Sequence, residues 1–123
     1  MARLGPEELL KRLDRALETG GRAFTPRDVA AFVEEGKFQC WQRNETCVLT
    51  EIQQYPRYRV LNVFAIIGEL NDAMDQLPEV IAFARKHDCK KIMAAGRPGW
   101  KKIVPKYGFK VNPRIIFEMD IAA

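Results

Sequence analysis

The chain has 123 residues, of which 47 % are apolar, so it can bury a core in one domain without disulfide bonds. A charged fraction of 29 % and a net charge of +4 argue neither for a disordered chain nor, on composition alone, for an obligate nucleic-acid binder. The charge is unevenly placed, because the segment from Lys90 to Phe117 holds eight cations and no acid. No apolar run approaches the roughly 20 residues of a membrane span, and we expect a cytoplasmic protein.

The first third of the chain predicts two amphipathic helices. Residues 6–19 space their leucines at helical intervals after an opening proline. In the second helix Thr25 is the expected N-cap, Pro26 takes the first position and Asp28 stands where a capping box places an acid. Gly36 is expected to end this helix.

Strand-like segments follow. Residues 38–43 and 46–55 flank Asn44-Glu45 and predict a hairpin. Folded about this turn, the hairpin would place four side chains on one face: Cys40, Gln42, Cys47 and Leu49. Residues 59–68 are so nearly all apolar that we expect them to form the centre of the sheet, covered on both faces.

The second half predicts a helix from Asn71 or Asp72 to His87, with Pro78 as a late start or a kink. Residues 90–96 predict a strand that lies parallel to 59–68 through a helical crossover. A short amphipathic helix should come next, with its apolar face formed by Trp100, Ile103, Val104 and Tyr107. The alternating tail, residues 110–121, predicts a last strand.

This order of elements, over about residues 24–119, resembles the GNAT-type N-acetyltransferases without their first strand. The most specific stretch is IMAAGRPGWKKIVPKYGFK, which is similar to that family's strand, helix and Gly-Phe pair. The resemblance implies an α/β (α+β) domain of residues 1–123, with a mixed, mainly antiparallel sheet, helices on both faces and helix 6–19 as an accessory element. Short phage-encoded virion and assembly proteins look similar in the Cys-Trp strand and the Gly-Arg-x-Gly-Trp turn.

The family's phosphate loop, Gln/Arg-x-x-Gly-x-Gly/Ala, corresponds here to GELNDAMD. If acetyl-CoA were bound, the resemblance would place it beside Ile66, Ile67, Gly68 and Asn71. Three carboxylates occupy the loop, however, and at an effective dielectric near 20 each like-charge contact at about 5 Å costs on the order of 3 kcal/mol. These carboxylates are Glu69, Asp72 and Asp75. The loop therefore predicts no cofactor.

The family's general acid is a Tyr four residues before the Gly-Phe pair, and Val104 stands at that position. Arg97 stands where the family carries the Asn that leads the helix. General acids contribute typically 10²- to 10⁴-fold, and Val cannot donate a proton, so we name no catalytic residue. Weak candidates for a general base are Glu51, Glu69 and His87.

The favoured prediction is a non-catalytic protein-interaction or structural module on an acetyltransferase-like scaffold, in a bacteriophage virion or its assembly and located in the host cytoplasm or the virion. Its predicted partner-binding residues are Arg97, Trp100, Lys101, Lys102 and Lys106. Trp41 is a second candidate, and an unpaired sheet edge would allow self-association.

Three alternatives remain. One is an acyl-CoA-dependent N-acetyltransferase with an atypical phosphate loop, which would bind acetyl-CoA. Another is a nucleic-acid binder that uses residues 90–114, and the third is a basic face that only contacts water. We predict no metal site, although Cys40, Cys47, Cys89 and His87 would make a zinc ligand set if the fold brought them together.

Overall fold

The computed structural model describes residues 6–19, 24–96 and 98–121. Its elements, in chain order, are α1 (Pro6–Thr19), α2 (Pro26–Glu34), β1 (Phe38–Arg43), β2 (Thr46–Gln54), β3 (Arg59–Ile67), α3 (Leu70–Asp75), α4 (Leu77–Lys86), β4 (Cys89–Ala94) and the 3-10 helices η1 (Pro98–Lys102) and η2 (Val104–Tyr107). Within these residues no helix is long and apolar enough to cross a membrane.

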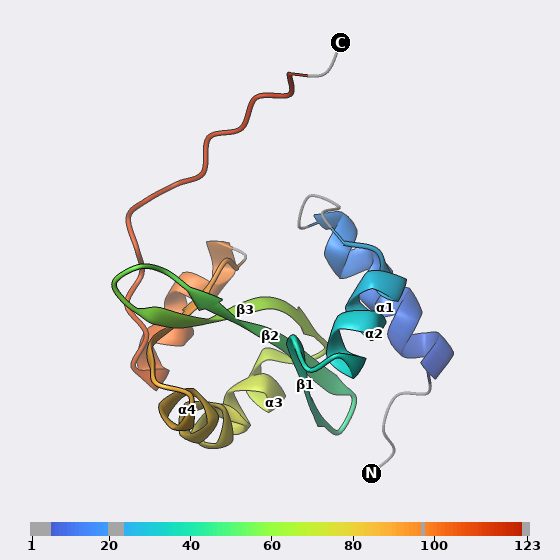
Figure 1. Cartoon of the computed structure of the whole chain (residues 1–123), viewed down its shortest axis with the longest axis horizontal. Coiled ribbons are helices and arrows are strands. Elements are labelled where there is room, and N and C mark those ends of the chain that lie inside the picture. Colours follow the sequence, from blue (N-terminus) through green and yellow to red (C-terminus); the bar gives the residue numbers. More distant parts are fainter. Residues whose placement is uncertain (1–5, 20–23, 97, 122–123) are drawn as a thin grey trace.

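One four-stranded sheet, in the order β1-β2-β3-β4, organises the chain (Figure 1). β1 and β2 form the predicted antiparallel hairpin, in which Cys40 lies opposite Leu49 and Gln42 opposite Cys47. β3 pairs antiparallel with β2 and parallel with β4. The predictions of an interior strand at 59–68 and of a parallel crossover to the next strand are confirmed.

α1 and α2 cover one face of the sheet. Their buried side chains pack on residues of β1, β2 and β3, and the cluster contains Leu13, Leu17, Val29, Phe38, Cys47, Leu49, Ala65 and Ile67. The predicted capping box of α2 is present, because the Asp28 N–H donates to Thr25 Oγ1 and the Thr25 N–H donates to Asp28 Oδ2. The hydrogen bond from the Thr25 N–H to the carboxylate, and to a smaller extent the Thr25 side chain, lower the pKa of Asp28.

α3 and α4 cover the other face. Val80 and Ala84 of α4 pack on Leu61 of β3, and Ala73 of α3 packs on the neighbouring part of the sheet. The single helix predicted for this region is instead two helices that meet at Gln76. Pro78 explains the break, because its ring would clash with the carbonyl of Met74 in a continuous helix and it has no N–H to donate.

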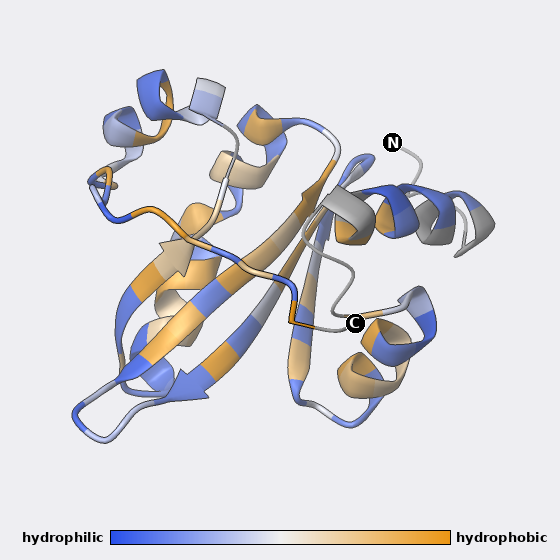
Figure 2. Cartoon of the chain, turned by 90° about the horizontal axis from the view of Figure 1, so that it is seen from above, coloured by the Kyte–Doolittle hydropathy of each residue, from blue (hydrophilic) through white to orange (hydrophobic). Residues whose placement is uncertain are grey.

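Two expectations for the C-terminal part are wrong. The predicted amphipathic helix is replaced by η1 and η2, because prolines and glycine interrupt the hydrogen-bond pattern that an α-helix needs. The predicted last strand is also absent, since residues 109–121 have no strand partner among the described residues. The tail instead extends away from the folded body (Figure 1), and its apolar residues alternate with polar ones (Figure 2).

Candidate functional site

The turn after β3 corresponds to the family's phosphate loop, and it is packed against the β1–β2 hairpin. Ile67 is buried, Ile66 is half-buried, and Gly68 follows with φ +111. A Cβ on Gly68 would lie 2.6 Å from Thr46 Oγ1 and 2.9 Å from the carbonyl oxygen of Glu45. Gly68 is therefore explained by its contact with the hairpin, without any need for a bound phosphate.

Hydrogen bonds lock the same turn to the hairpin. The Glu69 N–H donates to Thr46 Oγ1 at 2.9 Å, and Thr46 Oγ1 donates to Asp72 Oδ2 at 3.3 Å. Asn44 Nδ2 donates to the other oxygen of Asp72, also at 3.3 Å. Thr46 is completely buried, whereas Asn44 and Asp72 are half-buried and Glu69 is exposed, so the Thr46 hydroxyl anchors the turn from its buried side.

In this junction two backbone N–H groups and one carboxylate of the turn already have partners. Anion sites at helix N-termini use backbone N–H groups that point at the ligand. Here the N–H of Glu69 is bonded to Thr46, the N–H of Ala73 is bonded to the carbonyl of Glu69, and the Asp72 carboxylate is held in the first turn. The structure places Ile66 and Ile67 within the core and leaves Asn71 exposed.

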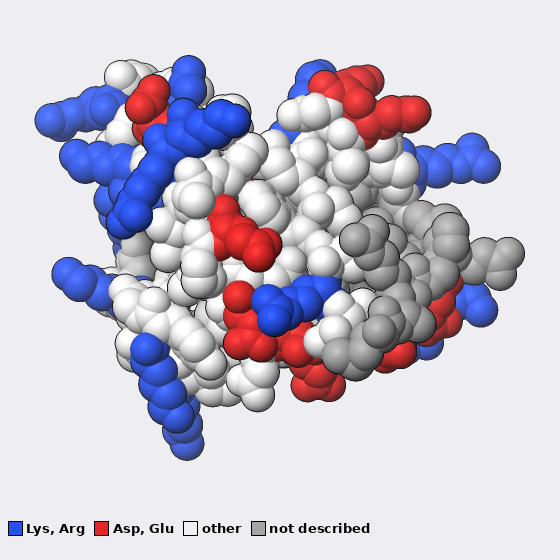
Figure 3. All heavy atoms as spheres, turned by 90° about the horizontal axis from the view of Figure 1, so that it is seen from below, with Lys and Arg blue, Asp and Glu red and all other residues white. Residues whose placement is uncertain are grey.

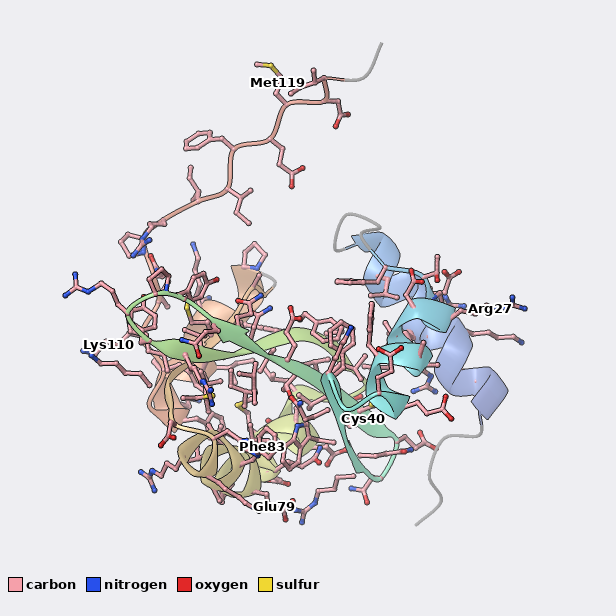
Figure 4. The ribbon with its side chains drawn as sticks, viewed as in Figure 1. Arg27, Cys40, Glu79, Phe83, Lys110 and Met119 are labelled. Carbon is pink, nitrogen blue, oxygen red and sulfur yellow. The ribbon has the colours of Figure 1, made fainter. Side chains whose placement is uncertain are left out.

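The basic segment after β4 places its cations in solvent. Lys101, Lys102 and Lys106 are exposed and form no ion pair within the described residues. Basic side chains predominate at the end of the molecule that carries η1 and η2 (Figure 3), near the labelled Lys110 (Figure 4). Arg97, a predicted contact residue, lies outside the described residues.

Trp100 is half-buried and lies against the backbone of Gly96. A Cβ on Gly96 would come within 2.2 Å of the Trp100 ring, so the ring is seated on that glycine. The six-membered part of the Trp100 ring is thus covered by Gly96, and the rest of the half-buried side chain is the part that a partner could contact.

The family's catalytic positions hold no proton donor here. Val104, at the general-acid position, is half-buried in η2, and Tyr107 is 39 % exposed. Glu51 accepts a hydrogen bond from Gln53 Nε2, and the ring of His87 lies 4.3 Å from that of Phe83. The contacts of Glu51 and His87 are thus with side chains two and four positions away in the sequence.

The second candidate, Trp41, belongs to the core. Its ring packs 5.4 Å from Phe83, and its Nε1 donates to Thr50 Oγ1 at 3.1 Å. Both polar and apolar parts of the side chain are thus used inside the protein. The hypothesis that Trp41 contacts a partner is not supported.

Two of the three cysteines lie side by side. Cys40 Sγ and Cys47 Sγ are 3.0 Å apart across the hairpin, on the face predicted from the turn. The hydrogen bond with Cys40 and the burial of Cys47 raise the pKa of the Cys47 thiol. No group of three or more potential metal ligands occurs among the described side chains, so the zinc set that includes Cys89 and His87 is not formed there.

The thiols should therefore differ in reactivity. We expect iodoacetamide at pH 8 to modify Cys47 at least about tenfold more slowly in the folded protein than in urea, because the thiolate is the reactive form. Mass spectrometry of tryptic peptides would measure both rates, with exposed Cys40 as an internal reference. Equal rates for Cys47 in the two conditions would contradict its burial.

Sequence reasoning missed a hollow between α2 and the sheet. Its volume is about 420 Å³, and its walls include Phe24, Phe32, Gly36, Phe38, Glu51 and Ile52. The three phenylalanines contact one another edge-on or tilted, with ring centroids 5.0–6.3 Å apart. The only signal in the sequence is the recurrence of Phe around α2, which equally predicts a core.

Comparisons with known proteins support the fold. No protein-family model and no curated protein sequence matches the chain. Among solved structures, a probable acetyltransferase has a TM-score of 0.65 at 12 % identity, covering 95 % of this chain and 92 % of that one. A predicted acetyltransferase from Clostridium acetobutylicum, solved with acetyl-CoA, has a TM-score of 0.66 at 14 % identity, covering 92 % and 88 %.

The aminoglycoside N-acetyltransferase AAC(6')-Iy, solved in complex with CoA, is a further neighbour. Its TM-score is 0.59 at 13 % identity, and the match covers 94 % of this chain and 91 % of that one. The chain therefore has a GNAT-like fold. Identities this low show the fold alone.

Proposed function

We propose that this chain is a non-catalytic protein-interaction module on a GNAT-like scaffold. The observation that supports this most is the closed junction between the turn after β3 and the hairpin, where Gly68, Thr46 and Asp72 fill the place of a phosphate loop. The half-buried Val104 at the general-acid position points the same way.

The surface that meets a partner would be the exposed basic one formed by Lys101, Lys102 and Lys106 around the edge of Trp100. Tryptophan is enriched at the centre of protein interfaces, and the lysines around it would belong to the charged rim of such an interface. The complementary partner is an acidic protein surface. A setting in a phage virion or its assembly is part of this proposal, and genes for capsid, portal or tail proteins beside this one would support it.

An acyl-CoA-dependent N-acetyltransferase is the second candidate, favoured by the acetyl-CoA and CoA complexes among the fold neighbours. Calorimetric titration with acetyl-CoA separates the two candidates. We expect no heat of binding at millimolar ligand, with a coenzyme-binding GNAT enzyme titrated in parallel as the positive control. Micromolar binding would show that the non-catalytic proposal is wrong.

A further inference from the structure

We propose that residues 111–121 form an antiparallel strand along the outer edge of β4 in a second copy of this chain, so that two copies exchange these C-terminal segments. The inference goes beyond the proposed function, because it concerns a different surface, and it rests on that function only in assuming that the chain works through protein contacts.

The C-terminal segment is apolar and fully presented to solvent in the single chain. Phe117 is 87 % exposed and Ile116 is 78 % exposed, and the other large apolar side chains are Val111, Ile115, Met119 and Ile121. The segment leads away from the body (Figure 1), and the labelled Met119 lies far from the sheet (Figure 4). An exposed apolar stretch of this kind marks a binding segment.

β4 offers a matching edge. It pairs with β3 on one side, and no described strand lies on its other side. Its residues Lys90 and Lys91 approach the ring of Tyr58, at 5.9 and 4.9 Å from the ring centroid. Lysines on an edge strand discourage pairing with unrelated strands. The C-terminal segment carries the only acids after Asp88, namely Glu118 and Asp120, so its charge is complementary to these lysines.

The faces of the two strands define a register. Ile92 packs with Leu61 and Val80 toward α4, so its neighbours Lys91 and Met93 point to the opposite face. Placing Phe117 opposite Ile92 in an antiparallel pair extends the α4 cluster with an aromatic ring. The same register puts Ile116 opposite Met93, which is 43 % exposed, and Glu118 opposite Lys91.

A second copy provides a strand partner both for the edge of β4 and for residues 111–121. In each chain the C-terminal segment and the outer edge of β4 both lack a strand partner among the described residues. A two-fold exchange covers both β4 edges and both segments, and only the outer edges of β1 stay unpaired. Each side of the interface contains the eleven residues of 111–121 and the six of β4. With the residues that flank them, the number of residues on each side approaches the roughly 20–30 of stable complexes.

Disulfide trapping tests the register and the occupant together. A full-length Met93→Cys chain is mixed with an Ile116→Cys chain and oxidised with diamide. We expect a product of twice the chain mass, and tryptic peptides joined between positions 93 and 116. The matched control mixes Met93→Cys with Ile115→Cys, whose side chain points to the other face, and should give less than about one tenth of that product. The parent chain reports any linking by its native cysteines.

Light scattering at high micromolar concentration gives the second measurement. The full chain should have twice the mass of one chain, and Phe117→Asp should weaken the dimer at least about 30-fold. Ile116→Asp changes the neighbouring position, which lies on the same face as Lys91 and diagonal to it. This variant should change the dimer's dissociation constant by less than about threefold.

Three outcomes would overturn the inference. The full chain could be monomeric, or Phe117→Asp could leave the dimer unchanged. In a chain that carries both Met93→Cys and Ile116→Cys, a disulfide within one chain would place the segment on its own edge. Acetyl-CoA binding would instead remove the proposed non-catalytic role and leave a trapped dimer standing.

Discussion

Replacing Gly68 by alanine should lower the free energy of unfolding by about 2–5 kcal/mol. Two costs add at this position. The positive φ of Gly68 costs an L-residue about 1–2 kcal/mol, and forcing a methyl group into a packed contact costs about 1–3 kcal/mol. The contact is severe because the new Cβ would meet the buried Thr46 and the backbone of Glu45 at under 3.0 Å. Urea unfolding followed by far-UV circular dichroism would measure the change.

Gly36→Ala is the matched control for this prediction. Gly36 also has a positive φ, +81, but a Cβ there would have no atom within 4 Å. It should therefore show the backbone cost alone, about 1–2 kcal/mol. Equal losses for both variants would mean that the Gly68 turn is not pressed against the hairpin as described.

Replacing Thr46 by valine should lower the free energy of unfolding by about 1–3 kcal/mol. Valine keeps the shape of the buried side chain but removes the oxygen that accepts from the Glu69 N–H and donates to Asp72. The loss comes from leaving a backbone donor and a carboxylate oxygen without their partner. Chemical denaturation, read by the same signal, would give the value.

Thr46→Ser tests whether the hydroxyl causes that loss. It keeps both hydrogen bonds and removes one methyl group, so it should cost about 1 kcal/mol. If the valine variant were as stable as wild type, or if the serine variant were the less stable of the two, the hydrogen-bonded junction would not hold the turn in place.

Local signals in the sequence predicted most of the fold. The capping box of α2 depends on residues three apart, and the hairpin register depends on a two-residue turn, so both can be read from neighbouring positions. Pro78 signalled a defect in the crossover helix, but whether the chain kinks or breaks there depends on how α3 and α4 pack against the sheet.

Features that depend on distant residues could not be predicted. Gly68 meets Thr46 across 22 positions of sequence, and nothing in the local pattern indicates that contact. The alternation of residues 111–121 signals a strand, yet a strand forms only where a partner edge is available. The spacing around Trp100 satisfied a helical pattern although the local prolines and glycine favoured 3-10 turns.

That Lys101, Lys102 and Lys106 contact a partner stays a prediction. These three side chains are exposed, whereas Trp41 is used in the core. The acidity of the turn after β3 was evident from the sequence, but the sequence did not show that Asp72 is held there by Asn44 and Thr46. The Asp72 carboxylate, which would repel a diphosphate, is thus held in place by hydrogen bonds within the fold.

We propose that the turn after β3 is a structural junction and does not receive a diphosphate. Backbone amide NMR spectra of the full chain, recorded as acetyl-CoA is added to millimolar concentration, test it residue by residue. We predict that the amide resonances of Leu70, Asn71 and Asp72 do not move. Saturable shifts of these amides at micromolar coenzyme would contradict the claim and place the phosphates on the first turn of α3.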